Sequence, residues 1–162
     1  MNGGLAADAR LVAEILATAE GEALSSGAPH IGAEHLVIGC LTASDPSARA
    51  ALAADRVDDR AVRAALARVL DRAVLRASVD PIGEVDDPDS VVEGTPSLSA
   101  DAAAVLARAR VLSRSHRPRG LQSADVLVAV AEQRDGVAAE VLDDLGVDRQ
   151  RLFDFRDWSA GR

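Results

Sequence analysis

Glu34 and His35 are the residues of this chain whose types and spacing most readily suggest chemistry. They stand side by side in the stretch HIGAEHLVIG, residues 30–39, just before an apolar run. A carboxyl group beside an imidazole suggests an acid/base pair, part of a metal site or a contact for a ligand. A Glu in the first turn of a helix also simply favours the helix dipole.

The spacing of these residues argues against catalysis and metal binding. Neighbouring residues on a helix point about 100° apart, so Glu34 and His35 are not expected to converge on one substrate atom. A zinc site needs spacing such as H-E-x-x-H, which His30, His35 and His116 lack. His35 is interpreted as a packed or capping residue. We expect no enzyme, no catalytic residues, no metal and no cofactor, because no Ser/His/Asp or Cys/His set converges either.

The composition predicts a fold built from helices. Apolar residues make up 48% of the 162 residues, mostly Ala, Leu and Val, and aromatic residues only 2%. Such a core suits closely packed helices. The three aromatic residues, Phe153, Phe155 and Trp158, lie near the C-terminus, where they form either an exposed docking motif or, as we expect, the anchor of the last helix.

The net charge limits the classes of partner that the protein is expected to bind, and the cysteine content indicates its cellular compartment. The formal net charge is −8, which disfavours binding to nucleic acid or to anionic lipid. The single cysteine, Cys40, excludes an internal disulfide and is expected to be buried rather than reactive. No signal peptide and no membrane-spanning run is apparent, so a cytoplasmic protein is predicted.

The chain repeats itself at an offset of 90 residues. Gly27–Val62 aligns without a gap on Arg117–Leu152, for example Leu36 with Val126. Between the halves lies a stretch with three prolines, two glycines and six acids, which argues against a regular helix. We predict a single domain whose first repeat spans about 5–77, whose acidic linker spans about 78–97 and whose second repeat spans about 98–158.

Each repeat is predicted to form four helices, giving an all-α bundle of eight helices with pseudo-two-fold symmetry. The expected helices are about 6–25, 33–43, 45–55, 58–77, 99–115, 123–133, 136–145 and 148–158. Asp45 or Ser44 is expected to cap the third helix, with Pro46 at its first position. In the fourth helix Val62, Leu66, Val69, Leu70 and Val74 are expected to face inward.

A long helix followed by a G-A-E-H stretch and then by an LGVD-type stretch, twice over, resembles the Clp N-terminal domain. The matching text is GAPHIGAEHLVIGCL in the first repeat and GVAAEVLDDLGVDRQRL in the second. This is the double Clp repeat at the front of Clp-family unfoldase subunits, and the resemblance covers about Leu5–Leu152. No G-x-x-x-x-G-K-[ST] phosphate loop occurs, so an ATPase module is missing and the chain is either an excised or a freestanding N-domain. The resemblance implies a recognition module for proteins or peptides, namely Clp unfoldase or protease components, adaptors or clients.

The resemblance also implies where a ligand would bind. In similar Clp proteins the Glu of each G-T-E-H motif helps to hold a phosphorylated arginine, and Glu34, between Ala33 and His35, matches that position. A carboxylate suits a guanidinium, and helix N-terminal amides suit a phosphate. The second repeat carries the counterparts Ser123, Ala124 and Asp125 and has lost this Glu, unless Asp125 substitutes.

A hydrophobic docking patch for peptides is a second feature implied by the resemblance, at Leu5 and Leu98. The residues themselves add a basic run near the end of the fifth helix, which contains Arg110, Arg114 and His116 together with Arg117 and Arg119. The run is interpreted as a solvated face with cations near a helix C-terminus, with an anion site or an acidic partner as the alternative.

The leading hypothesis is therefore a non-catalytic Clp-repeat binding module in regulated proteolysis, which recognises substrates, adaptors or degradation marks such as phosphoarginine. The alternative is a stand-alone helical regulator or decoy that contacts other proteins without any link to an ATPase. Neither hypothesis requires nucleic acid or a membrane.

Overall fold

The fold is known from a computed structural model that describes residues 3–79, 95–116 and 120–160, without the side chains of residues 3, 116 and 158–160. The predicted linker falls mainly in residues 80–94, which lie outside what is described. Of the basic run, Arg117, Arg119 and the side chain of His116 also lie outside it. The elements are α1 (Gly3–Ser26), β1 (His30–Ile31), α2 (Ala33–Thr42), α3 (Ser47–Leu52), the 3₁₀ turn η1 (Ala53–Asp55), α4 (Asp59–Val79), β2 (Ser97–Leu98), α5 (Ala100–Leu112), the 3₁₀ turn η2 (Ser113–His116), α6 (Ser123–Ala131), α7 (Val137–Asp144) and α8 (Arg149–Ala160).

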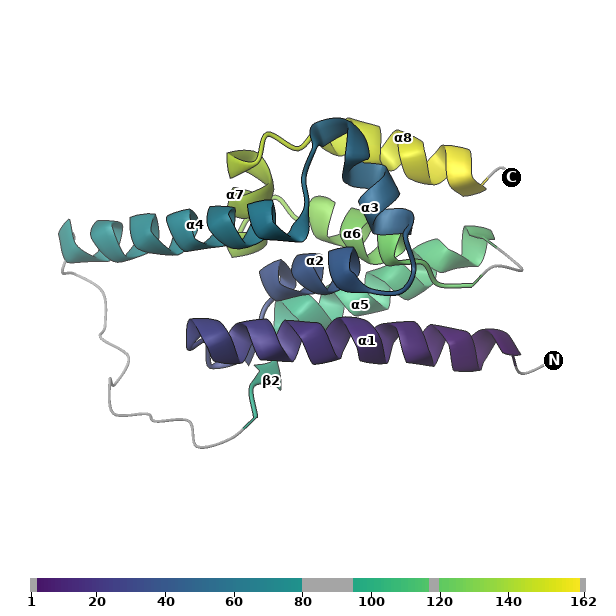
Figure 1. Cartoon of the computed structure of the whole chain (residues 1–162), viewed down its shortest axis with the longest axis horizontal. Coiled ribbons are helices and arrows are strands. Elements are labelled where there is room, and N and C mark those ends of the chain that lie inside the picture. Colours follow the sequence, from purple (N-terminus) through teal and green to yellow (C-terminus); the bar gives the residue numbers. More distant parts are fainter. Residues whose placement is uncertain (1–2, 80–94, 117–119, 161–162) are drawn as a thin grey trace.

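Two short helices occupy the centre of the fold. The helix α2 packs on α1, α4, α6 and α7, while α6 packs on α5, α3 and α8 (Figure 1). Leu36, Val37 and Ile38 of α2 are fully buried, as are their repeat counterparts Val126 and Leu127 in α6. The all-α class and the arrangement of two four-helix repeats are confirmed, and the two central helices occupy equivalent places in the two repeats.

The helix boundaries differ from prediction most at α3. This helix has only six residues and begins at Ser47, with Pro46 at its N-cap, so the expected Pro at the first helical position is wrong. The Asp45 side chain accepts a hydrogen bond from the backbone N–H of Ser47 (3.3 Å) and also bonds into the second repeat. Asp45 thus bonds both to the start of α3 and to Ser123 of the second repeat.

A short parallel strand pair joins the two repeats. His30 pairs with Ser97 and Ile31 with Leu98, and the Ser99 backbone N–H and hydroxyl both donate to the Ile31 carbonyl, at 3.1 and 2.9 Å. Ser99 also caps α5 by accepting from the N–H of Ala102 (3.3 Å). Residues so far apart in the chain give no periodic signal, and the pair was not predicted.

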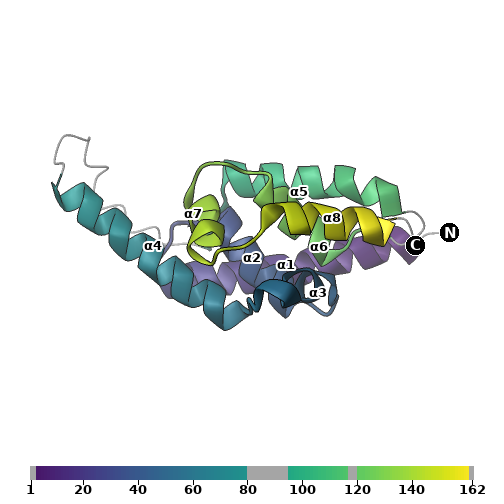
Figure 2. The ribbon, with the colours of Figure 1, turned by 90° about the horizontal axis from the view of Figure 1, so that it is seen from above.

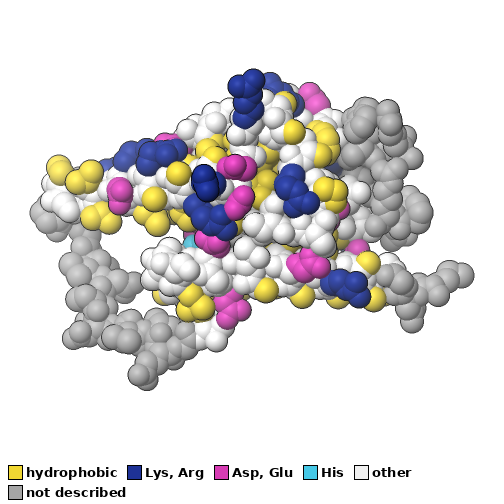
Figure 3. Space-filling view, viewed as in Figure 1, with side chains coloured by type: hydrophobic (Ala, Val, Ile, Leu, Met, Phe, Trp, Pro, Cys, Tyr) yellow, Lys and Arg dark blue, Asp and Glu magenta, His cyan; other side chains and the backbone are white. Residues whose placement is uncertain are grey.

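The helix α4 runs past the rest of the molecule, as two perpendicular views show (Figures 1 and 2). Val62, Leu66 and Val69 are buried as expected, but Leu70 and Val74 are 37% and 66% exposed, so their predicted inward orientation is wrong. Their part of the helix lies beyond α2, and hydrophobic side chains gather on its surface (Figure 3).

Ion pairs to α7 hold the outer part of α4. Arg68 and Arg72 both pair with Asp144, at 2.7 and 2.8 Å, and Arg76 pairs with Glu140 (2.9 Å). These hydrogen bonds from Arg68 and Arg72 lower the pKa of the Asp144 carboxyl. Polar contacts therefore replace apolar packing where the helix leaves the core.

Phe153 and Phe155 help to anchor α8, as expected, while the side chain of Trp158 lies outside what is described. Leu152 is fully buried, and Phe153 and Phe155 are partly buried against the core. Among the residues described, no helix is long and apolar enough to cross a membrane.

Candidate functional site

The start of α2 is organised around His35. The ring is 2% exposed, and its Nδ1 accepts a hydrogen bond from the backbone N–H of Gly32 (3.0 Å). Because an N–H can only donate, Nδ1 carries the lone pair, and the ring proton is assigned to Nε2, which faces the Ser26 hydroxyl (3.4 Å). His35 is therefore buried and caps the start of α2, in line with the packed or capping role expected for it.

The Glu34 carboxylate folds back over Gly32. Its side chain is 14% exposed, and Oε1 lies 3.3 Å from His35 Nδ1. A Cβ atom at residue 32 would lie 2.2 Å from this oxygen, so glycine makes the space for it. Glu34 and His35 are therefore in contact with each other. They still do not form an acid/base pair, since Nδ1 is engaged by Gly32 and the ring is buried.

Two backbone donors at the start of α2 are unpaired, although Ala33 itself is fully buried. The N–H groups of Ala33 and Glu34 have no acceptor in the part of the chain that the structure describes. The first N–H groups of a helix have no partner within the helix and carry its positive dipole end. Donors for an anion thus lie beside a carboxylate that can receive a cation.

The equivalent donors at the start of α6 are occupied. The backbone N–H of Ser123 donates to Asp45 Oδ2 (2.8 Å), and so does the Ser123 hydroxyl (2.5 Å). The N–H of Ala124 donates to the Ser47 hydroxyl (2.9 Å). Burial alone would raise the pKa of the Asp45 carboxyl, but the hydrogen bonds from Ser123 and Ser47 outweigh it and hold the pKa below its usual range.

Asp125 takes the position of His35 rather than that of Glu34. Its side chain is fully buried, and Oδ2 accepts from the backbone N–H of Gln122 (3.0 Å), as His35 accepts from Gly32. Ala124, at the Glu34 position, is 2% exposed. The two repeats therefore share the capping hydrogen bond. They differ in that the Glu34 carboxylate lies over the start of α2, whereas Asp45 and Ser47 bond to the start of α6.

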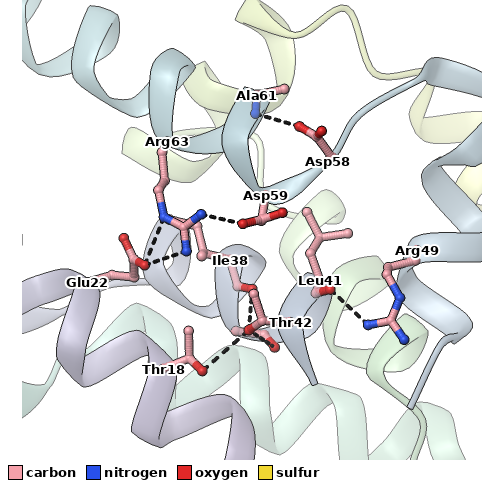
Figure 4. A network of polar contacts seen from close by, with 11 residues as sticks. Thr18, Glu22, Ile38, Leu41, Thr42, Arg49, Asp58, Asp59, Ala61 and Arg63 are labelled. Carbon is pink, nitrogen blue, oxygen red and sulfur yellow. Dashed lines mark hydrogen bonds and ion pairs between the residues drawn. The ribbon is translucent and has the colours of Figure 1, made fainter. Parts of the chain in front are cut away.

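Polar side chains link the helices around α2 to one another and to the end of α2 (Figure 4). Arg63 of α4 bridges Glu22 of α1, at 2.7 Å, and Asp59, and these hydrogen bonds raise the pKa of Arg63 and lower that of Asp59. At the far end of α2, Arg49 donates to the carbonyls of Leu41 (2.9 Å) and Ala43 (2.7 Å). The start of α2 is thus presented by a firmly held helix.

The two leucines of the predicted docking patch lie in different places. Leu5, 78% exposed, lies near the start of α1 and lines a cleft of about 420 Å³ with residues from α5 and η2. Leu98 is 39% exposed and lies in β2, paired with the strand that follows the other end of α1 (Figure 1). Leu98 does not line the cleft of Leu5.

Cys40 is a buried free cysteine, and the described residues contain no cluster of side chains suited to a metal ion. Cys40 is fully buried, as expected, and burial raises the pKa of its thiol. Within residues 3–79, 95–116 and 120–160, no three His, Cys, Asp or Glu side chains are grouped to hold a metal ion.

The chain matches a known protein family. A family model described as the Clp repeat (R) N-terminal domain matches residues 10–145. A search of curated proteins found no match.

Proposed function

The chain belongs to the Clp repeat N-terminal domain family, a family of non-catalytic domains that bind substrates and adaptors, and from this premise we propose that it recognises marked client proteins in regulated proteolysis. The proposed ligand is a phosphorylated arginine on the client. The proposed site is the start of α2, with Glu34 as the residue that binds the guanidinium. We place this activity in the cytoplasm, in line with the single, buried cysteine Cys40.

One observation carries the proposal, namely the difference between the two helix starts. The N–H groups of Ala33 and Glu34 are unpaired among the described residues, whereas those of Ser123 and Ala124 are bonded to Asp45 and Ser47. A phosphoryl group next to a guanidinium needs N–H donors and a carboxylate side by side. Of the two helix starts, only that of α2 combines unpaired N–H donors with a carboxylate among the described residues. This difference supports one site per chain.

We propose a role for each residue of this site. The amides of Ala33 and Glu34 would donate to phosphate oxygens, and the Glu34 carboxylate would turn from its place over Gly32 towards the guanidinium. His35 would stay buried and hold the first turn of α2 through Gly32. The second-repeat residues Ser123, Ala124 and Asp125 would not take part, because the N–H groups of Ser123 and Ala124 are already bonded to Asp45 and Ser47, and the Asp125 carboxylate to Gln122.

Isothermal titration with phosphoarginine and with an arginine-phosphorylated protein tests this proposal. We expect the wild type to bind one equivalent and Glu34→Gln to bind at least about tenfold more weakly, since charge-assisted hydrogen bonds contribute about 1.5–3 kcal/mol. Glu20→Gln, which removes a carboxylate from α1 away from this site, is the matched control and should bind as the wild type does. Unphosphorylated arginine should not bind.

Two results would overturn the proposal. Absence of binding by the wild type would exclude phosphoarginine as the ligand, and equal binding by the wild type and Glu34→Gln would place the site elsewhere. The link to proteolysis has a separate test, capture of purified Clp unfoldase subunits and adaptors on the immobilised protein. If no Clp component or adaptor is retained, the protein acts outside the Clp system.

A further inference from the structure

Asp135 and Gly136 form the chain's one Asp-Gly pair and lie in the connection between α6 and α7. Both residues are exposed. Gly136 has φ 94° and ψ 174°, a backbone conformation that residues with a side chain rarely adopt. Nothing lies within 4 Å of the position that a Cβ atom would take there. The pair is therefore a surface connection with open space around it.

The Asp135 carboxyl and the Gly136 backbone N–H have no partner in the part of the chain that the structure describes. Neither group makes a hydrogen bond there, and the carboxyl makes no ion pair. The amide nitrogen is therefore not held away from the carboxyl group by another contact. Glycine also lacks a side chain that would obstruct the approach of this nitrogen to Cγ of Asp135. Because both groups belong to adjacent residues, the reaction between them needs no encounter in solution.

The equivalent pair in the first repeat cannot react in the same way. Asp45 corresponds to Asp135 and is followed by Pro46, whose nitrogen carries no proton. The Asp45 carboxylate is also held by hydrogen bonds from Ser47 and Ser123. The carboxyl group is thus protected in one repeat and free in the other.

We propose that Asp135 is a modification site at which the folded protein isomerises spontaneously to isoaspartate. The Gly136 nitrogen attacks Cγ of Asp135, its proton and the carboxyl hydroxyl leave together as water, and a cyclic imide forms. Water then opens the ring. Cleavage between the nitrogen and Cγ restores aspartate. Cleavage between the nitrogen and the main-chain carbonyl carbon of Asp135 leaves a chain that runs through Cγ and a free α-carboxylate. The water lost in the first step is regained in the second, so the solvent is the only other reactant.

This change adds a methylene group to the backbone immediately before α7. The first hydrogen bond of the helix runs from the Glu140 N–H to the Gly136 carbonyl (3.1 Å). Ala138 and Ala139, in the first turn, are 2% exposed, so the start of α7 is packed closely against the core. Farther along, Asp144 pairs with two arginines of α4. A longer connection displaces the helix start from this close packing, and α7 docks less firmly as a result.

Incubation of the purified protein at physiological temperature tests the proposal. Cleavage after glutamate releases residues 133–140, whose aspartyl and isoaspartyl forms have equal mass and separate by reversed-phase chromatography. Isoaspartyl methyltransferase, which esterifies the free α-carboxylate, identifies the second form. We expect isoaspartate to form in the folded protein at a rate within about tenfold of that in a synthetic peptide of residues 133–140. A slower rate, or no isoaspartate in this peptide, would overturn the proposal.

Thermal unfolding tests the effect on α7. The Tm of the isomerised fraction should be lower than that of the fresh protein by about 2–4 °C, and repair with the methyltransferase and its methyl donor should restore it. Asp135→Glu is the matched control, because it keeps the charge but does not readily form the ring, and its Tm should not change during the same incubation. An unchanged Tm of the isomerised wild type, or an equal loss in Asp135→Glu, would overturn the effect assigned to Asp135.

Discussion

Asp45 in the first repeat accepts two hydrogen bonds from Ser123 in the second, one from the backbone N–H (2.8 Å) and one from the hydroxyl (2.5 Å). The Ser123 hydroxyl in turn accepts from the N–H of Ala48 (3.1 Å), at the start of α3. At the matching position of the second repeat, Asp135 is exposed and makes no such contact with Ala33. The Asp45–Ser123 interaction thus joins the two repeats and has no equivalent between Asp135 and Ala33.

Removal of the Asp45 carboxylate should destabilise the fold. Asp45→Ala leaves the N–H of the buried Ser123 without its acceptor, while the Ser123 hydroxyl keeps the Asp45 carbonyl and the Ser47 hydroxyl as partners. We expect the free energy of unfolding to fall by about 1–3 kcal/mol. Asp135→Ala is the matched control, 90 residues later in the chain, and should change the stability by less than about 0.5 kcal/mol. Urea unfolding followed by circular dichroism measures both. Equal effects of the two variants would contradict the role given to Asp45.

The same carboxylate should make the stability depend on pH in the acid range. The pKa of Asp45 is below its usual range in the folded protein, so its contribution is complete above the unfolded pKa of about 4 and is lost as the pH falls through the lower folded pKa. The stability difference between the wild type and Asp45→Asn should therefore shrink as the pH is lowered from about 6 to about 2. Urea unfolding across this range measures it, and a constant difference would show that ionised Asp45 contributes nothing special.

Gly39 should not tolerate a side chain. A Cβ atom there would lie 2.5 Å from the backbone oxygen of Ile15, where α2 crosses α1. We expect Gly39→Ala to cost about 1–3 kcal/mol, because the helices must separate. Gly21→Ala is the control, since nothing lies within 4 Å of its Cβ position in α1, and it should stabilise by about 0.5–1 kcal/mol. Thermal unfolding should therefore move in opposite directions for the two variants.

The capping role of His35 predicts an order of stabilities. His35→Leu leaves the Gly32 N–H buried without an acceptor and should cost about 1–3 kcal/mol. His35→Asn keeps an acceptor near that N–H, as Asp125 does for Gln122, and should cost less. Chemical unfolding of the two variants gives the comparison. A leucine variant as stable as the asparagine variant would show that the ring contributes by packing and not by its hydrogen bond.

Much of the fold could be predicted because its signals are local. The stripe Leu11, Ile15, Ala19 and Ala23 is buried as helical spacing requires, and the apolar cores of α2 and α6 are buried throughout. In α4, Leu70 and Val74 continue the helical spacing of the buried residues Val62, Leu66 and Val69 and are nevertheless exposed. Amphipathic spacing shows which side of a helix is apolar, but not how far the neighbouring helices extend along it.

The candidate site was predicted in part for the same reason. Glu34 and His35 were identified from the motif, and the capping role of His35 follows from its place in the first turn. That Glu34 folds over Gly32, and that Asp45 closes the second site, required the three-dimensional arrangement, because these contacts depend on side-chain rotation and on residues 78 positions apart.

The sequence by itself determined the helical class, the repeat, the family resemblance and the loss of Glu at Ala124, since each depends on residue type and short-range spacing. Only the tertiary structure decided which helix start has unpaired donors and that Leu5 and Leu98 lie apart. These properties arise from packing between segments distant in the chain, and periodicity carries no information about such contacts.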